Sequence, residues 1–203
     1  MIIAIANLKG GVAKTTTAVH IACGLAKNGA TVLVDSDPNR SSLAWAGKSS
    51  NAPFKVITEI ELLKYQGQFK HIVTDTKARP EREDLKILLD TVNLIILPTP
   101  PNGDDLRVTV STAKALAELS STKHRVLLTK VPTHSGASDE QDARTWLESQ
   151  KIPVFKGRIR FYKAYDKAFL AGVPVYEVKK DRNAKLAWSD YQAVIKEVMD
   201  YGK

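Results

Sequence analysis

The stretch Asn7-Leu8-Lys9-Gly10-Gly11-Val12-Ala13-Lys14-Thr15-Thr16 directly follows the apolar run Ile2-Ile3-Ala4-Ile5-Ala6. A short β-branched strand that leads into glycines, Lys-Thr and a helical pattern is the context that a phosphate-binding loop requires. A glycine-rich turn that only joins a strand to a helix is the alternative. Because strand, loop, Lys-Thr and helix occur in register, the sequence favours a phosphate site.

The backbone of this loop supplies the first part of the expected chemistry. Gly10 and Gly11 let the chain turn tightly, so that successive N–H groups, including those of Val12 and Ala13, can surround a polyphosphate. The helix that begins near Ala13 adds the positive end of its dipole. We therefore expect the loop to bind phosphate mainly through backbone groups.

Three side chains at the start of the helix supply the second part. Lys14 is expected to reach the β- and γ-phosphate oxygens as a mobile cation, and the Thr15 hydroxyl to be the direct protein ligand of Mg²⁺. Thr16 is a weaker candidate, for phosphate binding or for helix capping.

Acidic residues follow two further apolar strands. Asp35 and Asp37 come after the apolar run 31–34, and Asp75 lies near the end of the run 72–76. Ligands of open α/β sheets bind at the carboxyl ends of the strands, so Asp75 is expected to hold Mg²⁺ through water. For the Asp35-Ser36-Asp37-Pro38 segment, a turn that caps the helix expected over 41–45 is the alternative.

Lys9, directly before the double glycine, makes the loop similar to the deviant Walker A loop of the ParA/MinD/Soj ATPases, which reads K-G-G-x-G-K-T-T. The resemblance implies an ATP and Mg²⁺ site in which Lys9 crosses a homodimer interface to the nucleotide of the partner. It also implies that Asp37 positions or activates the attacking water and that Asp35 lies near the Mg²⁺ shell.

The chain departs from the family pattern at several positions. Ala13 stands where the family has glycine: a Cβ close to the phosphates would weaken binding or slow hydrolysis, whereas a backbone with negative φ would tolerate alanine. Asn39 replaces a glutamine, and the segment 77–80 follows Asp75-Thr76 where the family has proline. Lys77 and Arg79 could contact phosphate, a partner subunit or only solvent.

The same resemblance assigns the base of the nucleotide. Residues 129–132 lie where relatives form the wall of the adenine pocket, which makes Lys130 a candidate ligand. Residues 158–162 lie where a family loop covers the base, which makes Arg160 a second candidate. The helix that starts at Asp104 either joins the dimer interface or packs on the sheet.

Composition limits the remaining choices. At 203 residues the chain can bury one full core. We expect a single domain over residues 1–203 with an α/β fold: a doubly wound, mostly parallel sheet flanked by helices. The sequence has no apolar run near 18 residues and no signal-peptide pattern, which predicts a cytoplasmic protein with no membrane contact. Cys23 is the single cysteine, so disulfides and cysteine metal sites within one chain are excluded.

The net charge of +8 is concentrated toward the C-terminus, because residues 151–203 carry 12 basic and 6 acidic residues. In ParA-type relatives a basic C-terminal surface binds double-stranded nucleoid DNA without sequence preference. The residues expected to do so are Lys179, Lys180, Arg182 and Lys185. A solvated basic face is the alternative. The helix expected over 186–201 has mixed charges, which favours docking onto the domain over attachment to a membrane.

The resemblance therefore predicts a small ParA-type ATPase with slow hydrolysis, of the plasmid-partition or carboxysome-positioning (McdA-like) kind. Such a protein works with a ParB-like or McdB-like adaptor that stimulates hydrolysis, and it associates with the nucleoid. Two other classes stay open: a MinD-like membrane-cycling ATPase, and a P-loop enzyme that transfers phosphate to a small molecule.

Overall fold

Runs of β-branched and other apolar residues form a six-stranded sheet in a computed structural model that describes residues 1–77, 82–119, 121–133 and 138–201. All of its strand pairs are parallel, and the order is β3-β2-β4-β1-β5-β6. The strands are β1 (Ile2–Ile5), β2 (Thr31–Ser36), β3 (Lys55–Thr58), β4 (His71–Thr76), β5 (Leu94–Thr99) and β6 (His124–Leu128). The predicted doubly wound α/β fold is confirmed.

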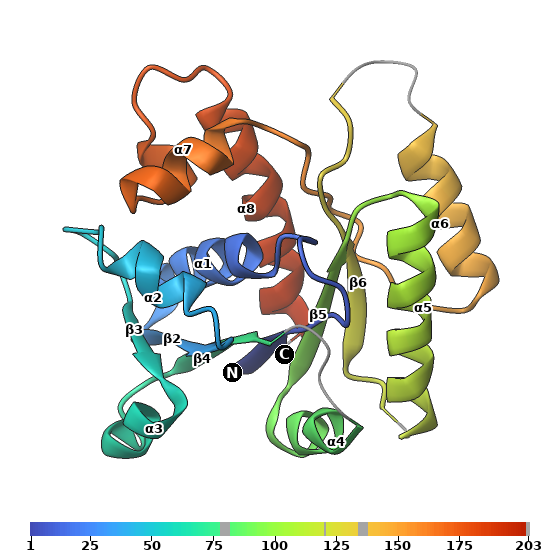
Figure 1. Cartoon of the computed structure of the whole chain (residues 1–203), viewed down its shortest axis with the longest axis horizontal. Coiled ribbons are helices and arrows are strands. Elements are labelled where there is room, and N and C mark those ends of the chain that lie inside the picture. The colour runs from blue at the N-terminus through green and yellow to red at the C-terminus, as the bar shows by residue number, and fades with distance from the viewer. Residues whose placement is uncertain (78–81, 120, 134–137, 202–203) are drawn as a thin grey trace.

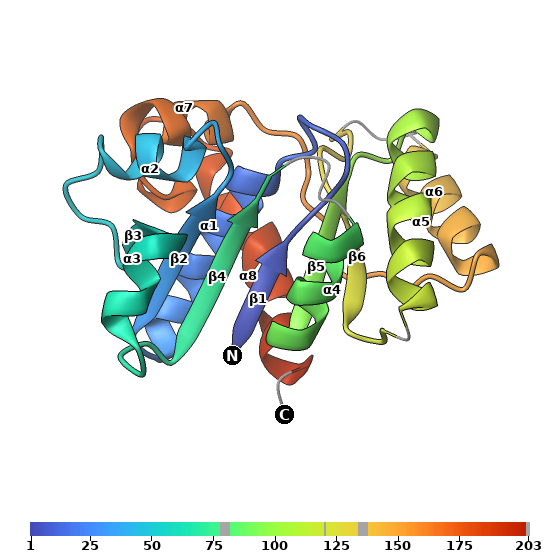
Figure 2. The ribbon, with the colours of Figure 1, turned by 60° about the horizontal axis from the view of Figure 1, so that its bottom comes forward.

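Helices cover both faces of the sheet (Figures 1 and 2). One face carries α1 (Lys14–Leu25), α2 (Ser41–Ala46), α7 (Ala164–Ala171) and α8 (Ala184–Tyr201). The other carries α3 (Glu59–Leu62), α4 (Arg82–Thr91), α5 (Gly103–Glu118) and α6 (Asp139–Ser149). Short 3₁₀ turns η1 (Ala26–Asn28), η2 (Leu63–Tyr65) and η3 (Val175–Glu177) extend or connect these elements.

The last helix docks onto the domain, as its mixed charges predicted. Trp188, Tyr191 and Val194 of α8 are buried in the same core cluster as Ile21 and Leu25 of α1. Within the described part of the chain, no helix combines the length and the apolar character that a membrane crossing requires.

β5 continues through Pro98 to Thr99, although proline has no N–H to donate to a strand ladder. Along β5 the N–H of Ile95 donates to the carbonyl of Lys123, directly before β6, whereas the carbonyl of Ile96 accepts from the N–H of Ala6, directly after β1. The nitrogen of Pro98 therefore faces the β1 side, where pairing has already ended at Ile96, and no ladder hydrogen bond is lost.

Two helices were not predicted from the sequence. α4 follows the segment 78–81, which lies outside the described residues and includes Arg79. α7 begins after Tyr162 and ends at Gly172, whose φ of 64° gives the left-handed cap that glycine adopts without strain. This glycine was the signal that could have revealed α7.

Candidate functional site

The phosphate-binding loop lies at the carboxyl edge of the sheet, between β1 and α1. Asn7 fixes its start: the side chain is fully buried and donates to the Pro98 carbonyl and to Thr109 Oγ1, at 2.9 Å each. Its Oδ1 accepts from the N–H of Lys9 at 3.0 Å. Asn7 thus ties the loop to β5 and α5, a role that the sequence did not reveal.

Ala13 adopts the backbone conformation for which the family uses glycine. Its φ is 72° and its ψ is 33°, in the left-handed region, and Gly11 has a φ of 76°. The tolerant alternative, negative φ at Ala13, is therefore wrong. An L-residue in this region is strained by roughly 1–2 kcal/mol, so the loop stores strain next to the expected phosphates.

Two ammonium groups converge on the loop. Lys14 is 7% exposed and its Nζ donates to the Lys9 carbonyl at 3.1 Å. Lys130, at the end of β6, donates from Nζ to the Gly11 carbonyl at 2.7 Å, and its neighbour Thr129 donates to the Val12 carbonyl at 3.1 Å. The loop is therefore clamped from the side of β6.

The predicted carboxylates meet at the neighbouring strand ends. Asp35 and Asp75 lie opposite each other in the β2–β4 register and are 0% and 1% exposed. Both oxygens of Asp35 accept backbone bonds, from the N–H groups of Asp37 and Leu43. Asp35 therefore holds the segment that carries Asp37.

Burial raises the pKa of Asp75 to about 6. Hydrogen bonds from Thr15 and Ser42 favour the charged carboxylate and oppose this shift. A buried carboxylate beside a threonine hydroxyl is a hard oxygen donor set, which fits Mg²⁺. Burial lowers the pKa of Lys14, while the charges of Asp75 and Asp37 oppose that shift. Bound phosphate would add negative charge beside Lys14 and favour its ammonium form.

Two adjoining clefts make up the expected nucleotide site. The first, of about 380 Å³, is lined by the loop together with Asp37, Asn39 and Ser41. The second is lined by the ends of both predicted base-binding segments, including Thr129, Lys130, Arg160, Phe161 and Tyr162. The residues that line both clefts are Ala13, Thr16, Lys130 and Asp166. The structure thus brings the predicted phosphate and base residues together.

Arg160 lines the second cleft, but its guanidinium is already engaged. It forms a forked ion pair with Asp190 of α8, with Nη2 2.6 Å from Oδ1 and Nε 3.0 Å from Oδ2. The backbone N–H of Arg160 also donates to Asp190 Oδ2. Arg160 therefore fixes the loop beside the cleft to α8.

Lys9 is paired within its own chain. Its Nζ lies 2.5 Å from Asp105 Oδ1, at the start of α5, and the Lys9 side chain is 39% exposed. The helix that starts at Gly103 also buries Leu106, Val110 and Ala113 against the sheet, so packing is one of its roles.

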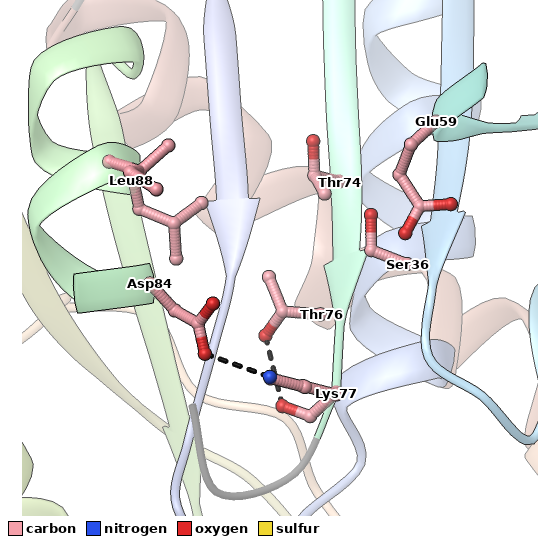
Figure 3. Close-up of a pocket in the computed structure, with 8 residues that line it drawn as sticks. Ser36, Glu59, Thr74, Thr76, Lys77, Asp84 and Leu88 are labelled. Carbon is pink, nitrogen blue, oxygen red and sulfur yellow. Dashed lines mark hydrogen bonds and ion pairs between the residues drawn. The ribbon is translucent and has the colours of Figure 1, made fainter. Parts of the chain in front are cut away.

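Lys77 forms an ion pair within its own chain. Its Nζ lies 2.8 Å from Asp84 of α4, at a groove of about 340 Å³ between α3 and α4 (Figure 3). The groove is also lined by Ser36, Thr74 and Leu88. None of the contacts proposed for Lys77 from the sequence included this pair.

The basic residues expected to contact DNA gather just before and within the first turn of α8. Lys179, Lys180, Arg182 and Lys185 are all exposed. Nearby, Lys167 is neutralised by Asp181 at 2.7 Å. The four cations form one exposed segment, which we call the basic cluster.

The sequence assigned no role to several residues that the structure places at the site: Asn7, Asn39, Ser41, Ser42, Asp105 and Asp166. Asn39, Ser41 and Ser42 follow Asp37-Pro38 within four residues, which was the available signal for these three. Asp105 and Asp166 reach the site only through the packing of α5 and α7, which no local pattern reveals.

Comparison with known proteins agrees with this geometry. Residues 1–99 match a family model described as an AAA domain. Maintenance of carboxysome distribution protein A from Gloeobacter kilaueensis is 36% identical over 203 residues, covering 97% of this chain and 93% of that protein.

Two solved structures share the fold. An ATP complex of a Cyanothece McdA variant superposes with a TM-score of 0.77 at 13% identity, covering 98% of this chain and 95% of the other. The MinD cell division protein of Aquifex aeolicus gives a TM-score of 0.74 at 18% identity, covering 98% and 97%.

The fold and the loop define a P-loop protein of the deviant Walker A class. Within that class, the chain belongs to the ParA/MinD-type family, in the part that includes maintenance of carboxysome distribution protein A.

Proposed function

We propose that this chain is an ATPase that dimerises with ATP, binds nucleoid DNA without sequence preference and positions or segregates a cargo. The observation that carries the proposal is the convergence of Lys9, Lys14, Thr15, Asp37 and Asp75 on one edge of the sheet. The name of the Gloeobacter relative supports a carboxysome as the cargo, and a plasmid is the other cargo that the family resemblance implies. An adaptor of the McdB or ParB kind would stimulate hydrolysis.

In this proposal each residue has a defined task. The loop from Gly10 to Ala13 binds the phosphates, Lys14 contacts their terminal oxygens, and Thr15 and Asp75 hold Mg²⁺. Mg²⁺, when bound, neutralises charge on the phosphates. Asp37 orients the attacking water, and its segment is already fixed by Asp35.

Dimerisation is the switch in this proposal. Lys9 exchanges Asp105 for the phosphates of the partner's nucleotide, so the two chains close around ATP. Closure brings two basic clusters onto one surface, and several phosphate contacts then form at once. Hydrolysis separates the chains and releases the DNA.

The variant Asp37→Ala tests the assignment of the hydrolytic step. It should bind ATP as tightly as the wild type and stay dimeric, while ATP turnover falls by at least tenfold, because only the water-orienting carboxylate is lost. Size-exclusion chromatography with light scattering, in ATP, ADP and no nucleotide, measures the oligomeric state, and phosphate release measures turnover.

Duplex DNA added to the same samples should co-elute only with the ATP-bound dimer. A chain that stays monomeric in saturating ATP and Mg²⁺, even as Asp37→Ala, would contradict the proposed switch. An unchanged hydrolysis rate in Asp37→Ala would remove Asp37 from its role.

A further inference from the structure

A buried hydroxyl links Asp75, the proposed Mg²⁺ ligand, to the helix that follows the segment with Asp37. Ser42, in the first turn of α2, donates from Oγ to Asp75 Oδ2 at 2.8 Å. The two side chains are 0% and 1% exposed, and they come from different elements, α2 and β4. Because both side chains are buried, the Asp75 carboxylate has to accept its hydrogen bonds from donors of the protein.

The first turn of α2 is held by two neighbouring strand ends. Its Ser42 hydroxyl bonds to Asp75 on β4, and the next N–H, that of Leu43, bonds to Asp35 Oδ2 on β2 at 2.9 Å. Asp35 and Asp75 are themselves opposite each other in the β2–β4 register. The connection from Asp35 to Ser42 includes Asp37, so this residue lies between the two anchors.

We propose that Ser42 is a positioning residue that orients Asp75 toward the Mg²⁺ site and couples it to the segment that carries Asp37. This inference rests on the proposed function, since it assumes that Asp75 holds Mg²⁺ with ATP. A displacement of residues 37–42 that moves Ser42 has to break or move the Ser42–Asp75 hydrogen bond. Conversely, Mg²⁺ bound near Asp75 holds Asp37 in place through Ser42, because such coupling is reciprocal.

If Ser42 has only a structural role, its removal affects stability and leaves metal binding unchanged. If Ser42 only satisfied a buried carboxylate, its loss would lower the free energy of unfolding and leave Mg²⁺ dependence unchanged. Partners of metal-ligand carboxylates typically change metal affinity by about 10–100-fold when removed. Metal dependence therefore separates the two roles.

The test compares Ser42→Ala with the wild type in the full chain. Binding of ATP is measured by displacement of a fluorescent ATP analogue, first in EDTA and then over a Mg²⁺ titration. The Mg²⁺ midpoint is the Mg²⁺ concentration that gives half of the change in ATP affinity. We expect this midpoint to rise about tenfold in Ser42→Ala, while the affinity for ATP in EDTA stays within twofold of wild type. Ser42→Thr keeps the hydroxyl and should restore the wild-type Mg²⁺ midpoint.

Thr112→Val is the matched control, because Thr112 is also fully buried and, among the described residues, its hydroxyl bonds only to the Val108 carbonyl on α5. It should shift the free energy of unfolding but not the Mg²⁺ midpoint. A Mg²⁺ midpoint within twofold of wild type in Ser42→Ala, or an equal rise in Thr112→Val, would overturn the positioning role. A wild type that binds no ATP in either condition would instead overturn the proposed function, and this inference with it.

Discussion

Ala13 shows at the scale of one residue how the site departs from its family. Its left-handed backbone, with φ 72°, is a conformation that glycine, the residue of the family pattern at this position, reaches without strain. The sequence identified the substitution but left its conformation open, because φ depends on how the loop is anchored by Asn7, Thr129 and Lys130.

Replacing Ala13 by glycine should stabilise the chain. Relief of left-handed strain outweighs the greater backbone entropy that glycine gives the unfolded state, so we expect the free energy of unfolding to rise by about 0.5–1 kcal/mol. Urea denaturation without nucleotide measures it. Ala115→Gly, in the regular interior of α5, should lower it by about 1 kcal/mol. A loss of stability in Ala13→Gly would show that the loop does not store strain.

His20 is expected to make stability depend on pH. It is a buried residue of α1, accepts the N–H of Val175 on Nε2 at 3.1 Å, and stacks on Tyr191 of α8. Burial lowers its pKa to about 4. In the unfolded chain His20 binds a proton near pH 6.5, whereas in the folded chain it stays neutral down to about pH 4. The free energy of unfolding therefore falls as the pH drops from 7 toward 4, by up to roughly 3 kcal/mol.

Denaturation at pH 7.5, 6 and 5 checks this, with His20→Leu as the comparison. The variant should be less stable at pH 7.5, because Val175 loses its acceptor, but its stability should fall less on acidification. Burial also lowers the pKa of His71 and His124, which adds acid sensitivity in both proteins. Burial raises the pKa of Asp75, so its protonation in the folded chain opposes the loss of stability on acidification, again in both proteins. Parallel pH curves for the two proteins would assign the acid sensitivity to His71 and His124.

At the scale of elements, the sequence predicted the strands and the first helix well. Their apolar runs and glycine boundaries are local signals, and the tight loop between β1 and α1 needs no distant contact. The contacts of Arg160 could not be predicted in this way, whereas the glycine that ends α7 is a local signal of the same kind. Arg160 and Asp190 are 30 residues apart, and their pairing depends on how α8 crosses α1.

Asp190→Ala should remove the ion pair that holds the loop around Arg160, beside the second cleft, to α8. Asp190 is 9% exposed, so its loss leaves the Arg160 guanidinium and backbone N–H without their partner. We expect the free energy of unfolding to fall by about 2–3 kcal/mol, measured by urea denaturation. Asp104→Ala, which breaks the exposed pair with Arg107, should change it by about 0.5 kcal/mol or less. Equal effects would mean that the Arg160 pair is no stronger than a surface pair.

At the scale of the whole molecule, the charge is uneven. The basic cluster lies at the start of α8, on the sheet face that also carries α1 and α7. The sequence predicted the basic excess of this region because charge can be counted along a chain. Both readings of the sequence, a DNA-binding surface and a solvated face, placed the four cations on the surface, and all four are exposed.

Reversing Lys179, Lys180 and Arg182 to glutamate tests the basic cluster as a DNA surface. Each phosphate contact releases about one counterion, so the slope of log affinity against log salt should become shallower by about three per chain. Fluorescence anisotropy with duplex DNA, in ATP and at several salt concentrations, measures it. Affinity for ATP should not change, because none of these residues lines either cleft of the nucleotide site.

The control reverses Lys64, Lys86 and Lys114, which are exposed on η2, α4 and α5. It changes the net charge of the protein by the same amount, but on elements of the opposite sheet face. If long-range attraction to net charge caused DNA binding, both triple variants would weaken it equally. If the cluster forms the contacts, only the first variant flattens the salt dependence, because counterions are released where phosphates are touched. Wild-type binding in the first variant would leave the basic cluster as an ordinary solvated face.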